Sequence, residues 1–228
     1  MTGTGVLCTK CVKREASITV GGRKLCELCA NNEVTRRAYR VLLDSGAIDL
    51  KHVTVLSSPQ FSGAERVLSR LFARMGRRHS RELEVVELAA KGGSVDTLIH
   101  SFLTAKGDLV LLPFTSDFLT AYLIYSISKG RGPIYVKLYS PYFHLRGTLF
   151  VSPMIRTSIL ELKGMGRVEI RTGEEEFDEL HRWVLDQLAE NPELLFTAPS
   201  SAKLFEGAET CQTCGATLVG GICPMCAL

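Results

Sequence analysis

Eight cysteines, arranged as four Cys-x2-Cys pairs, constrain the fold of this 228-residue chain more than any other feature of its sequence. Two pairs lie near each end of the chain, and no cysteine lies between Cys29 and Cys211. Paired thiolates on two tight turns complete a tetrahedron around one metal ion, so each set predicts a structural zinc site. The first site comprises Cys8, Cys11, Cys26 and Cys29, and the second comprises Cys211, Cys214, Cys223 and Cys226.

Disulfide bonds are the weaker interpretation of these cysteines. The N-terminal segment has no features of a signal peptide, and no apolar run is long enough to span a membrane, so we expect a cytoplasmic protein with reduced thiols. An iron–sulfur cluster in one of the two sites remains an open alternative. Four thiolates leave no open coordination position, and we therefore expect both sites to be structural. The glycine pairs at 21–22 and 220–221 predict a hairpin turn in each module.

The long segment between the two cysteine sets has the alternating pattern of an α/β domain. Expected strands at residues 52–56, 83–88, 108–113, 133–138, 149–151 and 167–170 alternate with expected helices at 31–45, from 64, 94–105, 115–128, 157–163 and 173–190. This order predicts right-handed crossovers and a doubly wound, mostly parallel sheet. We expect three units, namely a zinc ribbon at 1–32, the α/β domain at 33–200 and a zinc knuckle at 201–228.

Residues 51–71 form the strand, loop and helix on which such a domain is wound. The loop between the first strand and its helix is where nucleotide-binding α/β domains hold phosphate. Here it contains one glycine, one proline and no basic residue. Its candidate anion-binding groups are Ser57, Ser58, Ser62 and Gly63. The later loop at 113–117 adds Ser116 and Asp117. The expected role of these residues is nevertheless the ordinary one, in which they cap the helices that begin nearby and Asp117 is a charge favoured at a helix N-terminus.

Charge is distributed unevenly along the sequence. Residues 8–40 hold eight Lys or Arg against three Glu, and residues 66–81 hold six Arg. Residues 169–209, in contrast, hold eleven acidic and three basic side chains. This asymmetry favours a polyanion on one surface and a different contact on another, although solvated helix faces give the same pattern. The low content of Asn and Gln, three of each, is typical of a thermophilic source.

The order of cysteine ribbon, α/β core and cysteine tail resembles the cytosolic tRNA 2-thiolation proteins. Their catalytic members are PP-loop ATPases of the adenine-nucleotide alpha-hydrolase superfamily. CTKC…CELC opens this chain and CQTCGATLVGGICPMC closes it. Residues 57–62 lie where the catalytic members have SGGxDS, and PFTSD at 113–117 lies where they have GHNxDD. KGRG at 129–132 is similar to a basic turn of the family, and SPMIR at 152–156 lies where it has RPL.

The sequence departs from the catalytic members at the positions that carry their chemistry. Consecutive glycines of a PP-loop let backbone N–H groups approach pyrophosphate, but Ser58 and Pro59 replace them here, and proline has no N–H. The acidic position of the motif holds Gln60 or Phe61. Catalytic relatives also use core cysteines, which this chain lacks, and a persulfide cannot form without a thiol. The resemblance is therefore closest to the second, non-catalytic subunit of the thiolation complex.

That resemblance implies a pseudoenzyme that binds a catalytic PP-loop paralogue and tRNA in 2-thiolation of the wobble uridine, within a hetero- or homo-oligomer. The residues expected to contact tRNA are basic: Arg70, Arg74, Arg77, Arg78, Lys129, Arg131, Arg146 and Arg156. We expect reversal of charge at Arg74, Arg77 and Arg78 to weaken tRNA binding and its salt dependence.

Two other functions remain open at this stage. One is an active ATP-dependent adenylating enzyme or sulfurtransferase with an unorthodox loop, in which Asp117 holds magnesium. The other is a stand-alone zinc protein that binds nucleic acid, with bases stacked on an aromatic loop formed by Tyr139, Tyr142, Phe143 and His144. His181 and the other histidines are expected on helix surfaces or in structural contacts, since none pairs with a nucleophile.

Overall fold

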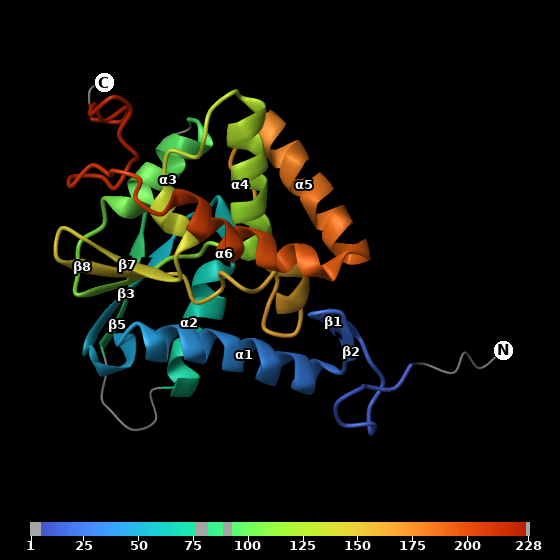
Figure 1. Ribbon diagram of the computed structural model, residues 1–228. Coiled ribbons are helices and arrows are strands. Elements are labelled where there is room, and N and C mark those ends of the chain that lie inside the picture. The colour runs from blue at the N-terminus through green and yellow to red at the C-terminus, as the bar shows by residue number, and fades with distance from the viewer. Residues whose placement is uncertain (1–5, 76–81, 89–92, 227–228) are drawn as a thin grey trace.

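The computed structural model describes residues 6–75, 82–88 and 93–226, and its centre is a five-stranded sheet (Figure 1). The strands are β3 (His52–Ser57), β5 (Glu82–Glu87), β6 (Leu109–Leu111), β7 (Tyr142–Leu145) and β8 (Thr148–Val151). Their order is β5-β3-β6-β8-β7, and neighbouring strands are parallel except β7, which is antiparallel to β8. The predicted mixed α/β fold with a mostly parallel sheet is confirmed.

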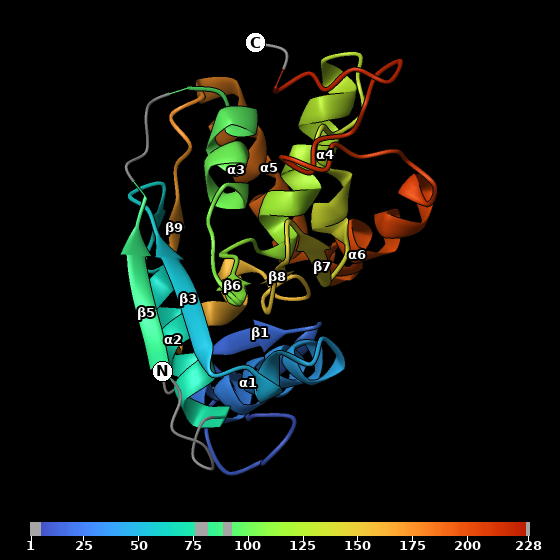
Figure 2. The same ribbon diagram turned by 90° about the vertical axis from the view of Figure 1, so that its left-hand side faces the viewer.

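Helices cover both faces of this sheet. In the view of Figure 1, α1 (Glu27–Asp44) and α2 (Ala64–Met75) lie below the sheet, whereas α3 (Val95–Leu103), α4 (Ser116–Ser128) and α5 (Glu175–Glu190) lie above it. Figure 2 shows the same two layers from the side. Because the chain moves from β3 to β5 and then back past β3 to β6, right-handed crossovers place α2 and α3 on opposite faces. In the described part of the chain, no helix is both long and apolar enough to cross a membrane.

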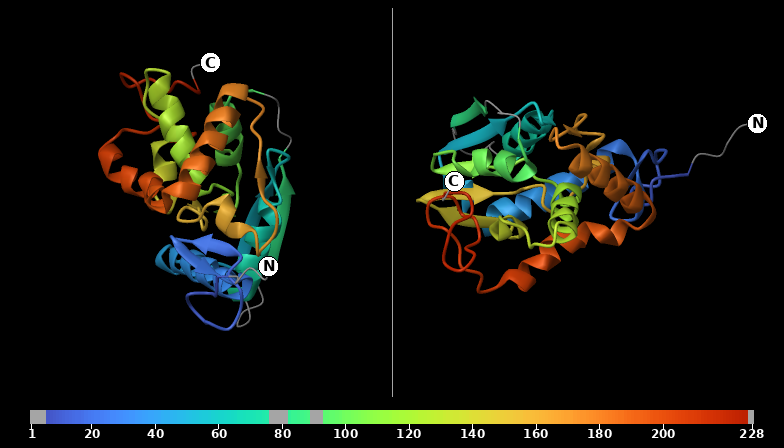
Figure 3. Two further views of the ribbon diagram at one scale, coloured as in Figure 1. Left: turned by 90° about the vertical axis from the view of Figure 1, so that its right-hand side faces the viewer. Right: turned by 90° about the horizontal axis from the view of Figure 1, so that it is seen from above.

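Short elements complete the chain. The N-terminal hairpin consists of β1 (Ile18–Val20) and β2 (Arg23–Leu25), and η1 (Ala47–Asp49) precedes β3. After α5, η4 (Pro192–Phe196), α6 (Thr197–Ser201) and η5 (Ala202–Phe205) lead to the C-terminal cysteines. Seen from above, these last helices run along the edge of α4 (Figure 3).

Several local signals in the sequence act as expected. The hydroxyl of Ser94 accepts a hydrogen bond from the Thr97 N–H at 3.3 Å and caps α3. Gly46 follows α1 with a φ of +73°, a left-handed conformation that ends the helix. Gly21 and Gly22 have φ values of +54° and +75°, as the tight turn between β1 and β2 requires.

Three predicted elements differ from the structure. Residues 133–138 are not a strand, because Val136–Tyr139 forms the 3-10 helix η2, in which Leu138 and Tyr139 are buried. Their apolar run resembles a core strand, and periodicity cannot separate the two over so few residues. The predicted helix at 157–163 is only the 3-10 helix η3 (Ile159–Leu162), and Glu169–Ile170 forms β9 outside the central sheet.

The aromatic segment that the sequence predicts to be a base-stacking loop is a β-strand over most of its length. Tyr142–Leu145 is the edge strand β7, and it turns into β8 through Arg146 and Gly147 with φ values of +53° and +81°. Phe143 stacks on Phe150 of β8 with ring centroids 5.5 Å apart. The predicted loop is therefore one half of a hairpin.

Residues 167–171, here called the strap, cross the loop that follows β3. Within the strap, β9 pairs antiparallel with β4 (Phe61–Ser62), so that Phe61 lies opposite Ile170. The Arg171 N–H also donates to the Gln60 carbonyl at 2.9 Å. Gly63 is left-handed at φ +83°, and a Cβ there would lie 2.2 Å from the Arg167 carbonyl oxygen. The strap therefore approaches the chain so closely at this position that only glycine fits.

Substitution of Gly63 tests how strongly the strap is held. We expect Gly63→Ala to lower the free energy of unfolding by about 1–2 kcal/mol for the left-handed backbone and by about 1–3 kcal/mol more for the clash with Arg167. Gly46→Ala is the matched control, because its φ is also left-handed and no atom lies within 4 Å of the added Cβ. Urea denaturation measures both variants. Equal decreases in the free energy of unfolding for the two variants would show that the strap moves away from residue 63 without a cost in free energy.

Candidate functional site

The loop at the carboxyl end of β3 is closed by its own hydrogen bonds. Ser58 is buried, and its hydroxyl donates to the Gln60 side chain at 2.6 Å and accepts from the Gln60 N–H at 3.3 Å. The Phe61 N–H donates to the Ser58 carbonyl at 3.0 Å. Ser57 is half-buried beside β5, and Ser62 is exposed in β4. The serines predicted to hold an anion therefore differ in exposure, and Ser58 already has partners within the loop.

Phenylalanine side chains fill the space beyond the carboxyl ends of β3 and β6. In a doubly wound sheet this is the point where the strand order reverses and where ligands bind. The ring of Phe61 lies 5.3, 5.5 and 5.1 Å from those of Phe102, Phe114 and Phe118, and Phe118 lies 5.4 Å from Phe177. All five are at most 1% exposed. Residues from β4, α3, α4, α5 and the loop after β6 thus form one aromatic plug.

Asp117 is completely buried and is bound by two other parts of the chain. One carboxylate oxygen accepts from the Ile159 N–H at 3.0 Å, and the other lies 2.7 Å from His181 Nε2. His181 is on the inner side of α5 and is only 2% exposed, so of the two expected places it has the structural contact and not the helix surface. The neighbouring Ser116 hydroxyl donates to the Leu195 carbonyl. The carboxylate proposed as a magnesium ligand therefore joins α4 to η3 and α5.

Both cysteine sets are assembled in the geometry that a metal ion needs. Within each set, all four sulfur atoms lie within 4.8 Å of one another. Cys11 and Cys26 are 3.8 Å apart, and Cys214 and Cys223 are 3.4 Å apart. A tetrahedral site with metal–sulfur bonds of about 2.3 Å separates its sulfurs by about 3.8 Å. Both clusters can therefore bind a metal ion, as the spacing predicts.

The first cysteine of each cluster favours a thiolate. Burial raises the pKa of Cys8, but the N–H groups of Cys26, Cys11 and Lys10 lower it to about 6 overall. The pKa of Cys211 is about 6 for the same reasons. Burial and neighbouring thiols raise the pKa of Cys29 to about 12. A bound cation would hold all of these groups as thiolates.

The two clusters are attached to the protein in different ways. The N-terminal cluster has a small core of its own, which consists of its cysteines with Ile18, Val20, Leu25 and Ala30. The C-terminal cluster packs on the main core instead, where Cys214 is buried and the Thr217 N–H donates to the Ile134 carbonyl at 2.7 Å. The first cluster is thus a separate module, and the second depends on the body of the protein.

Removal of one thiol tests each cluster separately. We expect Cys29→Ser and Cys214→Ser each to lose one of two equivalents of metal, because three thiolates no longer close the site. Colorimetric metal analysis of the folded protein gives the count, and a chain with both substitutions should hold none. Retention of both equivalents by either single variant would contradict the assignment. Absorbance in the visible range would identify an iron–sulfur cluster in place of zinc.

Of the basic residues predicted to contact tRNA, five have side chains in the described part of the chain. Arg77 and Arg78 lie outside the described residues, as does the side chain of Arg74. Arg156 is exposed. The other four donate to groups of the same chain: Arg70 to the Met165 carbonyl, Lys129 to Glu176, Arg131 to Asp96 at 2.5 Å, and Arg146 to the Leu103 carbonyl.

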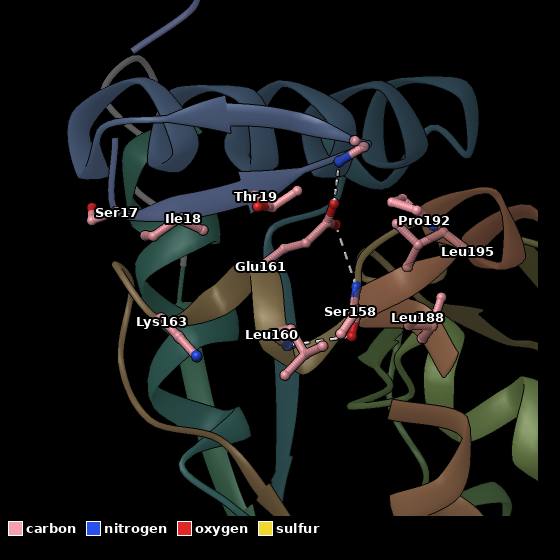
Figure 4. A pocket seen from close by; sticks show the side chains of 13 residues that line it. Ser17, Ile18, Thr19, Ser158, Leu160, Glu161, Lys163, Leu188, Pro192 and Leu195 are labelled. Atoms are coloured by element: carbon pink, nitrogen blue, oxygen red, sulfur yellow. Dashed lines mark hydrogen bonds between the residues drawn. The ribbon is translucent and has the colours of Figure 1, made fainter. Parts of the chain in front are cut away.

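A pocket of about 270 Å³ lies between the N-terminal hairpin, η3 and the end of α5 (Figure 4). Its buried carboxylate is Glu161, which accepts from the Gly21 N–H at 2.7 Å, from Arg37 at 3.0 Å and from the Ser158 N–H at 3.4 Å. Burial raises the pKa of Glu161, against the effect of the Arg37 guanidinium and the two N–H groups. The capping-box spacing of Ser158 and Glu161 is visible in the sequence, but the contacts with Gly21 and Arg37 are not, because those residues lie far away along the chain.

Comparison with known proteins gives one informative likeness. No family model matches the sequence, and no curated protein matches it. Among solved structures, the chain is similar to the U34-tRNA thiolase NcsA from Methanococcus maripaludis, described with its [4Fe-4S] cluster. The TM-score is 0.63 at 13% sequence identity, over 98% of this chain and 95% of the thiolase. The two proteins share a fold from end to end.

Proposed function

We propose that this chain is a non-catalytic subunit for 2-thiolation of the wobble uridine of tRNA, which binds tRNA and a catalytic paralogue of the same fold in the cytoplasm. The full-length likeness to a U34-tRNA thiolase supports a role in tRNA thiolation. The observation that carries the non-catalytic part is the aromatic plug, because Phe61 and its neighbours occupy the place where this fold binds ligands.

The groups that remain around the plug support the same proposal. A phosphate cradle needs several free backbone N–H groups that point at one anion. Pro59 has no N–H, and the N–H groups of Gln60 and Phe61 donate to Ser58. Asp117 is bound by His181 and by a backbone N–H. Nucleotide binding would require the plug, the loop and this carboxylate all to rearrange.

Sulfur transfer needs a thiol or a cluster near the substrate. All eight cysteines belong to the two terminal clusters, and we propose structural zinc in both. Closed four-thiolate sites hold the chain together and leave no thiol for a persulfide. The catalytic paralogue would therefore supply both the activated uridine and the sulfur, and this chain would supply binding surface.

Nucleotide titration tests the non-catalytic part. We expect no heat of binding when ATP and magnesium are titrated into the protein at concentrations up to about 1 mM. A dissociation constant above this range corresponds to a binding free energy smaller than about 4 kcal/mol, which is too weak for a functional nucleotide site. A U34-tRNA thiolase that retains the SGGxDS motif serves as the positive control under the same conditions. Micromolar ATP binding by this chain would contradict the proposal and favour the active adenylating enzyme.

Reconstitution tests the partner. We expect the tagged chain to co-purify with the U34-tRNA thiolase of its own source and to increase thiolation of a U34-containing tRNA transcript by that enzyme. The 2-thiouridine product is measured by mass spectrometry. A thiolase that neither binds this chain nor changes its rate with it would leave the independent zinc protein as the better explanation.

A further inference from the structure

We propose that the N-terminal cysteine module binds the phosphate backbone of RNA through the outer knuckle at residues 10–14 and the adjoining hairpin. This inference rests on the proposed function for its ligand, and it names the surface that holds the RNA. The module lies at one end of α1 and projects from the body of the protein (Figure 1). Its own small core allows it to present a surface independently of the sheet.

The module is one of the basic segments of the chain. Residues 8–26 contain five basic side chains and one acidic residue, Glu15. Lys13, Arg14 and Lys24 are exposed. Glu33 of α1 is buried beside the module, where Lys10, Arg23 and Arg36 surround it at 2.7–3.3 Å. The exposed cations lie outside this group of ion pairs, and such a group of exposed cations is typical of a surface that binds a polyanion.

Comparison of the two knuckles shows a specific feature at the tip. In each, the N–H of the residue after the second cysteine donates at 2.9 Å to the carbonyl of the first, and that residue is left-handed. At the C-terminal knuckle this residue is Gly215, which faces Leu145 of the core. At the N-terminal knuckle it is Val12, with a φ of +54° and a side chain that is 66% exposed.

A β-branched residue in this conformation costs about 1–3 kcal/mol, and such strain is characteristic of functional sites. Val12 contributes nothing to the core, because it is exposed to solvent, and the exposed Lys13 and Arg14 follow it directly in the sequence. An apolar side chain among cations can pack on a ribose or a base while the cations contact phosphates. A protein partner fits less well, because protein interfaces are depleted in lysine and enriched in aromatic residues.

Two variants separate charge from apolar contact. The module variant is Lys13→Ala/Arg14→Ala/Lys24→Ala. It removes three positively charged side chains and keeps the backbone hydrogen bonds that Arg14 and Lys24 accept. Lys106→Ala/Arg182→Ala/Lys203→Ala is the matched control, because it removes three exposed cations from the body of the protein. Val12→Gly removes the apolar tip and relieves the left-handed strain, so it cannot weaken binding through misfolding of the knuckle.

The experiment measures affinity of the full, metal-loaded chain for a labelled U34-containing tRNA transcript by fluorescence anisotropy at several salt concentrations. At 0.1 M salt the module variant should bind RNA about eightfold more weakly than wild type for each phosphate contact that it has lost, and this difference should vanish toward 1 M salt. The slope of log affinity against log salt concentration should be lower in magnitude by about 2–3. The control should bind as wild type. Val12→Gly should weaken binding about 3–10-fold, as expected for the loss of about 1 kcal/mol of apolar contact, and should leave the salt slope unchanged. The same variant should keep both metal ions and should melt no lower than the wild type.

Each contrary outcome has a distinct meaning. Wild-type protein that does not bind the transcript would overturn both this surface and the RNA-binding part of the proposed function. Equal affinities for the module variant and the control would overturn this surface alone. If the module variant keeps its RNA affinity but no longer co-purifies with the thiolase, the basic knuckle contacts protein and the proposal is wrong.

Discussion

Antiparallel pairing of the strap with β4 is the interaction on which the centre of this structure depends. It joins the loop after the first core strand to a segment more than a hundred residues later in the chain, and it holds Phe61 inward. Phe61 then provides the surface on which Phe102, Phe114 and Phe118 pack, which brings α3 and α4 together above the switch point of the sheet. A carboxyl edge that is usually open in this architecture becomes part of the hydrophobic core.

The buried polar groups around this core follow from the same closure. A buried carboxylate requires partners, and Asp117 finds them in His181 and the backbone of η3. The contact connects α4 to α5, so this buried carboxylate supports the packing of the two helices. The likeness to a thiolase over nearly the whole chain shows that the two proteins share this arrangement of helices and strands.

The sequence predicts what depends on neighbouring residues and misses what depends on distant ones. Cysteine spacing, the Ser94 cap and the apolar run of β6 are local, and the structure has each of them. The 3-10 helix at Val136–Tyr139 was mistaken for a strand because a short apolar run has no distinct period. Neither the aromatic plug nor the pair of Asp117 with His181 could be found, since their members come from separate elements that only the tertiary fold brings together.

The position of Glu161 has a consequence for how the N-terminal module is oriented. Its carboxylate binds Gly21 at the tip of the hairpin and Arg37 on α1, and Arg37 also donates to the Arg156 carbonyl at 3.0 Å. Hairpin, helix and body thus meet at one buried negative charge with a raised pKa. The angle between the basic knuckle and the sheet is therefore fixed by a joint that is electrostatic and sensitive to protonation, whereas the C-terminal knuckle is held by apolar packing and by hydrogen bonds between uncharged groups.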